Sequence, residues 1–160
     1  MLQELKKRIG NIEKPIFLFI NSTETIYSIM NKLDNSWNNL QLFCRIQQCK
    51  DLKDKKFSQA YSDWDAAKMN KYNFLTSRFF NALDIELDFQ PEVFIVTDVT
   101  TATQSILDPF TDTIQIIGRF RNGIVSASHI TNTDYKFQVR SKAQLQFRIN
   151  VFEENYKMLK

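Results

Sequence analysis

Short apolar runs that alternate with helix-like patterns constrain the fold of this chain most. Residues 14–21, KPIFLFIN, and 92–99, EVFIVTDV, are nearly continuous apolar runs of strand length. Such runs are typical of strands that are buried on both faces of a parallel sheet. After the first run, apolar residues recur at helical spacing in residues 26–33, and Asn21 with Glu24 resembles a capping box at the start of this helix. A strand that leads directly into a helix is the first half of a βα unit.

Three further segments are predicted strands: residues 40–46, 72–77 and 123–131. The lysine-rich residues 47–71 are expected to join the first two as a polar connection. Strands that alternate with helices imply a mostly parallel sheet with helices on both faces, so we expect an α/β fold of three layers. The chain has only three glycines and three prolines, and no linker divides it. We therefore expect a single domain that spans residues 1–160.

Two helices are expected in the second half of the chain. The first begins after Pro109, with Thr111 or Asp112 as its N-cap, and ends at Asn122-Gly123. The second is an amphipathic C-terminal helix that starts near Lys142. Its predicted apolar stripe consists of Leu145, Ile149, Phe152 and Tyr156.

The composition narrows the location and the partners. No apolar run approaches the roughly 18 residues that a membrane-spanning helix needs, and the N-terminus lacks a signal-peptide core. We therefore expect a cytoplasmic protein with no membrane partner. Cys44 and Cys49 are expected to be reduced thiols, and one histidine with two cysteines gives no metal-ligand set. The net charge of +3 permits binding to a polyanion without requiring it.

One segment stands out chemically. Residues 112–123, DTIQIIGRFRNG, place Arg119 and Arg121 beside a glycine in an otherwise apolar run. A guanidinium is always charged and binds phosphate oxygens in a bidentate manner, so such a pair is suited to an anion. The ordinary alternative is a pair of solvated arginines at a helix end, held by Asp108 or Asp112.

Three segments resemble motifs of superfamily 2 helicases. QIIGRFR, residues 115–121, resembles motif VI, in which Gln or His precedes Gly-Arg and a second arginine. TSRFFNALDI, residues 76–85, resembles motif V, and IFLFINSTE, residues 16–24, resembles motif IV. The three occur in the family's order, and each lies on the predicted element where the family carries it.

The resemblance implies the second, C-terminal RecA-like domain of a helicase or translocase, with the P-loop NTPase-like fold of such domains. It implies three sets of site residues: Gln115, Arg119 and Arg121 for catalysis, Gly118 and Asp84 for the nucleotide, and Asn21, Ser22, Thr23, Thr76 and Ser77 for a nucleic-acid backbone. The alternative for the hydroxyl residues is that they cap the helices that follow them. Asp84 has the same kind of alternative, the capping of a turn.

Arg119 is expected to be the arginine finger. An arginine supplied by a neighbouring domain is typically worth about 10³ to 10⁵ in the rate of phosphoryl transfer. Its helix is expected to be anchored by Ile114, Ile117 and Phe120. Arg121 comes one residue earlier than the family's second arginine, so a nearby acid or a phosphate backbone is an equal alternative for it.

The nucleotide-binding half of a motor is missing from this sequence. With glycines only at positions 10, 118 and 123, the chain has no G-x-x-x-x-G-K-[ST] segment. The resemblance therefore implies that ATP and Mg²⁺ bind only together with a first RecA-like domain, and that this chain alone holds neither. The implied partners are that domain and the backbone of DNA or RNA.

Two other functions stay open. Ala82 stands where motif V usually has glycine, and together with the shifted Arg121 it fits a RecA-like docking module for nucleic acid or protein that has lost catalysis. A free-standing nucleotide-binding domain of the flavodoxin type also fits the pattern of strands and helices, but it leaves the three ordered motifs unexplained.

Overall fold

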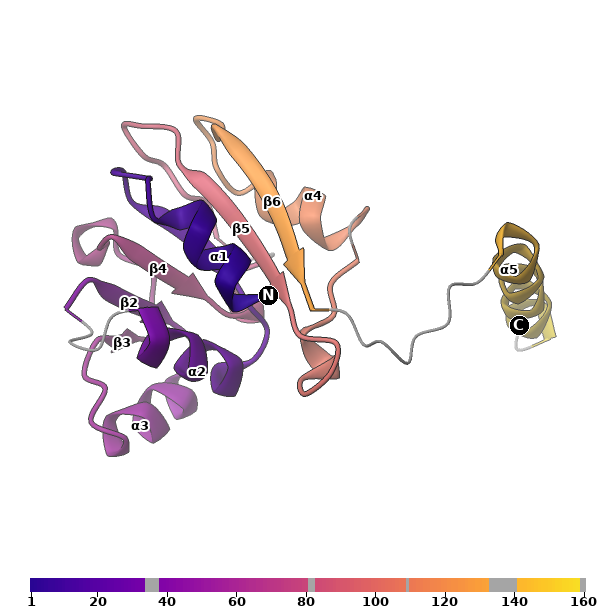
Figure 1. Cartoon of the computed structure of the whole chain (residues 1–160), viewed down its shortest axis with the longest axis horizontal. Coiled ribbons are helices and arrows are strands. Elements are labelled where there is room, and N and C mark those ends of the chain that lie inside the picture. Colours follow the sequence, from indigo (N-terminus) through magenta and orange to yellow (C-terminus); the bar gives the residue numbers. More distant parts are fainter. Residues whose placement is uncertain (34–37, 81–82, 109, 133–140, 159–160) are drawn as a thin grey trace.

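The structure is a computed structural model that describes residues 1–33, 38–80, 83–108, 110–132 and 141–158 (Figure 1). In these ranges six strands form one sheet in the order β3-β2-β4-β1-β5-β6. Every pair of neighbouring strands is parallel, so the predicted α/β fold with a parallel sheet is confirmed. The strands are β1 (Ile16–Phe19), β2 (Leu40–Phe43), β3 (Ala60–Tyr61), β4 (Tyr72–Leu75), β5 (Glu92–Thr97) and β6 (Ser126–Thr131).

Both faces of the sheet are apolar because side chains alternate along each strand. In β1, Ile16 and Leu18 belong to one buried cluster, whereas Phe17 and Phe19 belong to another. The first cluster is covered by α1 (Leu2–Ile9), α2 (Thr23–Leu33) and α3 (Ile46–Asp54). Their buried residues in this cluster are Leu5, Ile9, Ile26, Ile29, Met30, Cys49 and Leu52.

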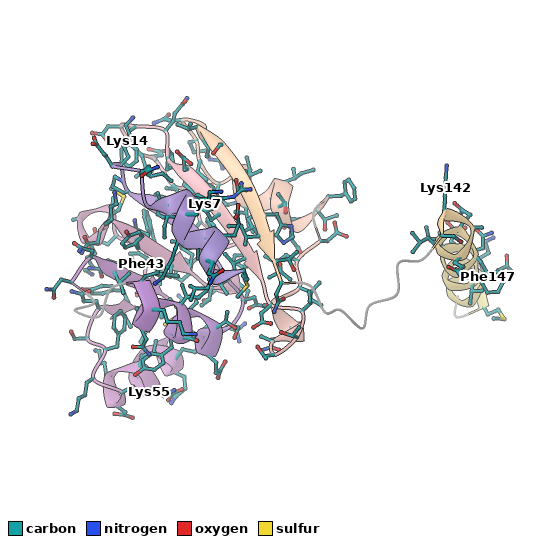
Figure 2. The ribbon with its side chains drawn as sticks, viewed as in Figure 1. Lys7, Lys14, Phe43, Lys55, Lys142 and Phe147 are labelled. Carbon is teal, nitrogen blue, oxygen red and sulfur yellow. The ribbon has the colours of Figure 1, made fainter. Side chains whose placement is uncertain are left out.

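Many aromatic rings pack against one another on the second face. Phe120 lies edge-on against Phe17, with ring centroids 5.1 Å apart, and Phe43, labelled in Figure 2, contacts Trp64 at 4.8 Å. The helix on this face is α4 (Asp112–Ile117), whose Ile116 is fully buried. Helices therefore contact both faces of the sheet, as the sequence predicted.

Two helices were not predicted. α1 buries Leu5 and Ile9, which are four residues apart and lie on one helix face. α3 lies within residues that we expected to be strand and polar connection, and it buries Cys49 and Leu52. The predicted strand 40–46 is correspondingly shorter, because β2 ends at Phe43.

The predicted capping box at α2 is wrong by one residue. Ser22 is the capping residue, since its Oγ accepts a hydrogen bond from the Thr25 amide at 3.2 Å. Asn21 lies outside the helix and donates its Nδ2 to the carbonyl of Gln104 at 2.8 Å. The Asn21 side chain therefore joins two loops.

The predicted length and anchoring of α4 also need correction. The helix ends at Ile117, not at Asn122-Gly123. Thr111 is its N-cap residue but makes no side-chain capping bond. Ile114 is 64% exposed and anchors nothing, whereas Ile116 is buried.

The predicted C-terminal helix is present as α5 (Lys142–Met158). In Figure 1 it lies apart from the sheet. Leu145 and Ile149, from the predicted stripe, are each 49% exposed, and Phe147, labelled in Figure 2, is 70% exposed. The side chains of Phe152 and Tyr156 lie outside the description. No helix in the described part of the chain has the length and apolarity to cross a membrane.

Candidate carboxyl-edge site

The carboxyl ends of the strands form the edge where the candidate site lies. After β1 the chain passes through α2 to β2 on one side, and after β5 it passes through α4 to β6 on the other. Because β1 and β5 are neighbours, their carboxyl ends form a topological switch point. Ligands of open α/β sheets bind in the crevice at such points.

A pocket of about 410 Å³ opens at this edge. The residues that line it come from the ends of β1, β2 and β4 and from the loop after β5. They are Asn21, Ser22, Thr23, Glu24, Arg45, Gln48, Ser77 and Gln104. Four of the five residues expected to bind nucleic acid therefore share one pocket, although they come from two separate motifs.

Thr76, the fifth of these residues, does not line this pocket. It is only 3% exposed, and its Oγ1 donates to the carbonyl of Phe43 at 3.4 Å. Its amide bonds the same carbonyl at 3.1 Å. Thr76 therefore ties the end of β4 to the end of β2, and Ser77 is the residue of the pair that lines the pocket.

Arg45 brings to the pocket a cation that the sequence did not predict. Residue 45 was placed inside a predicted strand, but β2 ends at Phe43, which puts Arg45 at the carboxyl edge. Its amide donates to Gln48 Oε1 at 3.1 Å, and its side chain is exposed. Among the described residues Arg45 has no salt-bridge partner.

A second pocket of about 540 Å³ adjoins the first, because Ser22, Glu24 and Gln104 line both. Asp98, directly after β5, lies in its wall and is 6% exposed. Burial acts to raise the pKa of this carboxyl, but hydrogen bonds from Thr101, Asn132 and Thr100 outweigh burial and hold the pKa well below its ordinary value. Asp98 is therefore ionised, and it ties the loop after β5 to Asn132, which follows β6.

The arginines of the GRFR segment lie outside both pockets. Phe120 forms a parallel bridge with Ile85, in which the Ile85 amide donates to the Arg119 carbonyl and the Arg121 amide donates to the Ile85 carbonyl. Arg119 and Arg121 lie in turns on either side of this bridge, and the Arg119 amide donates to the Ile116 carbonyl at 3.1 Å. The predicted helix therefore does not extend through the two arginines, because α4 ends at Ile117.

Asp84 is the carboxylate that both arginines share. Arg121 Nη2 donates to Asp84 Oδ1 at 2.6 Å, and Arg119 Nη1 lies 3.8 Å from the same oxygen. The hydrogen bond and the negative charge of Asp84 raise the pKa of Arg121 above its ordinary value. Asp108 and Asp112, the partners considered from the sequence, instead bond backbone amides of their own loop.

The remaining predicted residues of this segment are close to these arginines in the chain. Gln115 accepts a hydrogen bond from Arg119 Nε through its backbone carbonyl, at 3.1 Å, and its side chain is exposed. Gly118 follows α4 as its C-cap. The structure thus forms two separate groups, the carboxyl-edge pocket and a cluster of Arg119, Arg121 and Asp84, which we call the arginine cluster.

Among the residues that the structure describes, no group of three or more His, Cys, Asp or Glu side chains is arranged to hold a metal ion. Comparison of the chain with protein-family models, with curated proteins and with solved structures found no match.

Proposed function

We propose that this chain is the C-terminal RecA-like domain of a superfamily 2 helicase or translocase, and that its carboxyl-edge pocket binds the backbone of a nucleic-acid strand. The observation that carries the proposal is the shared pocket of Asn21, Ser22, Thr23 and Ser77. These residues come from the segments that resemble motifs IV and V, and they meet only because β1 and β4 are adjacent parallel strands. Hydroxyl and amide side chains suit phosphate oxygens and carry no base specificity.

Arg45 supports the same function. A guanidinium beside hydroxyl groups supplies the charge that attracts a phosphate, and among the described residues Arg45 forms no salt bridge. The electrostatic share of such binding depends on salt, because bound phosphates release their counterions. The proposed ligand is single-stranded DNA or RNA, held through its backbone.

Arg119 is the proposed arginine finger. Its backbone is fixed by the bridge to Ile85, and Phe120 beside it is buried against Phe17. Arg121 lies closer to Asp84 than Arg119 does, so the contact between Arg119 and Asp84 is the weaker one. Arg119 can therefore leave Asp84 more easily and reach a phosphate. In the complete motor, a first RecA-like domain would supply the sites for ATP and Mg²⁺, and Arg119 would stabilise the charge on the transferred phosphoryl group.

The test uses the two-domain protein that carries the first RecA-like domain. Arg119→Ala is expected to lower ATP hydrolysis about 10³-fold or more, while binding of a fluorescent oligonucleotide stays the same. Unchanged hydrolysis would refute the finger, and absence of oligonucleotide binding in the parent protein would refute the pocket.

A docking module without catalysis is the second candidate, because both arginines already have a carboxylate partner in Asp84. The same experiment separates the two candidates. A module binds the oligonucleotide or a protein partner, but its ATP hydrolysis, if any, does not respond to Arg119→Ala.

A further inference from the structure

Cys44 and Cys49 lie in an arrangement that the proposed function does not use. Their Sγ atoms are 3.2 Å apart, and Cys49 Sγ is also 3.7 Å from the Cys44 carbonyl. Cys44 directly follows β2, and Cys49 lies in the first part of α3. A disulfide has a sulfur–sulfur distance of about 2.05 Å, so the two side chains need to close by about 1 Å to become linked.

We propose that Cys44 and Cys49 are an oxidation site at which a peroxide forms an intramolecular disulfide. In the first step the thiolate of Cys49 attacks one oxygen of hydrogen peroxide, which gives a sulfenic acid and, after proton transfer, one water. In the second step the Cys44 sulfur attacks the Cys49 sulfenic sulfur and displaces a second water. Two thiols and one peroxide thus give one disulfide and two waters.

Burial selects both the oxidant and the order of the steps. Cys44 is fully buried and Cys49 is 5% exposed, so Cys49 is the sulfur that a small oxidant reaches first. Burial, together with the hydrogen bond between the two thiols, raises the pKa of Cys44, which disfavours its thiolate. Cys44 is therefore unsuited to start the reaction, and it resolves the sulfenic acid because its Sγ lies only 3.2 Å from Cys49 Sγ. A bulky disulfide such as glutathione disulfide reaches neither sulfur in the folded state.

A disulfide between Cys44 and Cys49 would enclose two residues of the carboxyl-edge pocket. Arg45 and Gln48 lie between the two cysteines in the chain, and both line the carboxyl-edge pocket. A link between Cys44 and Cys49 ties the end of β2 to α3 on either side of these two residues. Oxidation therefore restrains the segment that carries the cation of the pocket.

The test treats the whole chain, at high dilution, with hydrogen peroxide and then alkylates it under denaturing conditions before intact-mass measurement. The expected result is a loss of two hydrogens with no alkylated cysteine, reversed by dithiothreitol. Because the chain contains only two cysteines, an intramolecular disulfide has only one pairing. Oxidation of methionine shows that the peroxide has acted on the chain. If both cysteines are still alkylated at that point, the proposal is overturned. Disulfide-linked dimers would also overturn it.

Two variants test the order of the steps. In Cys44→Ala, Cys49 is expected to accumulate a sulfenic acid that dimedone traps, whereas Cys49→Ala is expected to react much more slowly. The serine variants serve the same purpose if an alanine variant does not fold. A parallel sample with glutathione disulfide is expected to keep both thiols, and rapid oxidation there would contradict the assignment to a small peroxide.

Discussion

Arg121 donates to Asp84 at 2.6 Å although the two residues come from distant parts of the chain. The bridge between Ile85 and Phe120 brings their backbones together. Arg119 faces the same carboxylate, with its Nη1 3.8 Å from the same oxygen. One carboxylate is thus shared unequally between two arginines.

Because Asp84 is shared, we expect Arg121→Ala to lower ATP hydrolysis and a second substitution, Asp84→Asn, to raise it again. In the two-domain protein, Arg121→Ala leaves Asp84 with Arg119 as its remaining arginine partner, so Arg119 is held away from the phosphate and ATP hydrolysis falls. Adding Asp84→Asn removes that competitor and is expected to restore much of the activity. Steady-state hydrolysis by the single and double variants measures the coupling. Equal activities of Arg121→Ala and the double variant would show that Asp84 does not compete for Arg119.

α4 offers a matched pair of isoleucines for a stability prediction. Ile116 is fully buried, whereas Ile114 is 64% exposed. Ile116→Ala is expected to lower the free energy of unfolding by about 2–5 kcal/mol, and Ile114→Ala by no more than about 0.5 kcal/mol. Urea unfolding curves of the two variants test this. Similar losses would mean that α4 packs against the sheet through a different face.

The central strands could be predicted from sequence because they are apolar on both faces. β1 and β5 lie within the predicted runs 14–21 and 92–99, and the apolar character of these runs reflects burial between two layers. α3 was missed because its only buried residues are Cys49 and Leu52, within a segment that is otherwise polar. A helix with so narrow an apolar face gives little periodic signal.

The site shows where local pattern is not enough. The segments around Ser22 and Ser77 were expected at strand ends, and adjacency of β1 and β4 brings them together. Arg119 and Arg121 were expected on a helix, but their conformation depends on Ile85, which is remote in sequence. A pattern of apolar residues within a short stretch of sequence cannot reveal a contact with a residue as remote as Ile85.

The carboxyl-edge pocket predicts opposite effects of its two charged residues. Arg45→Ala is expected to weaken binding of a single-stranded oligonucleotide and to reduce the salt slope of the affinity by about 1. Glu24→Gln removes a negative charge from the same pocket and is expected to tighten binding. Fluorescence anisotropy over a series of salt concentrations measures both effects.

Arg8→Ala is the matched control for the pocket. Arg8 is an exposed arginine on α1 that pairs with Glu4 at 2.7 Å and lines neither carboxyl-edge pocket. It is expected to leave the affinity nearly unchanged. If Arg8→Ala and Arg45→Ala weaken binding equally, the affinity follows from overall charge and not from the pocket.

The hydrogen-bonded carboxylate of Asp98 is expected to make the folded chain less stable in acid. Its pKa in the folded chain is held below its ordinary value, which is about 3.9 in an unfolded chain. The stabilisation is therefore fully present above about pH 4 and is lost as the pH falls toward the folded pKa. Asp98→Asn should be less stable than the parent at neutral pH, with a difference that shrinks in acid. Thermal unfolding from pH 7 to pH 3 tests this, and a difference that does not depend on pH would refute it.

We expect the sheet to fold without the C-terminal helix α5. Its apolar residues Leu145, Phe147 and Ile149 are about half exposed or more, and the helix lies apart from the sheet in Figure 1. A chain that ends at residue 140 is expected to keep the thermal midpoint of the full chain. A clear fall in that midpoint would show that α5 packs on the sheet in solution.

The central position of β1 has a consequence for how the chain reaches its fold. β1 is synthesised before its two neighbours in the sheet, because α2, β2, α3 and β3 come between β1 and β4 in the chain, and β5 follows β4. Until they emerge from the ribosome, the four apolar residues of β1 have no partner strand, and pairings between remote segments form slowly. Until β4 and β5 are synthesised, the nascent chain depends on α1 and α2 to cover the apolar residues of β1. We therefore expect chaperones to bind the nascent chain at this strand.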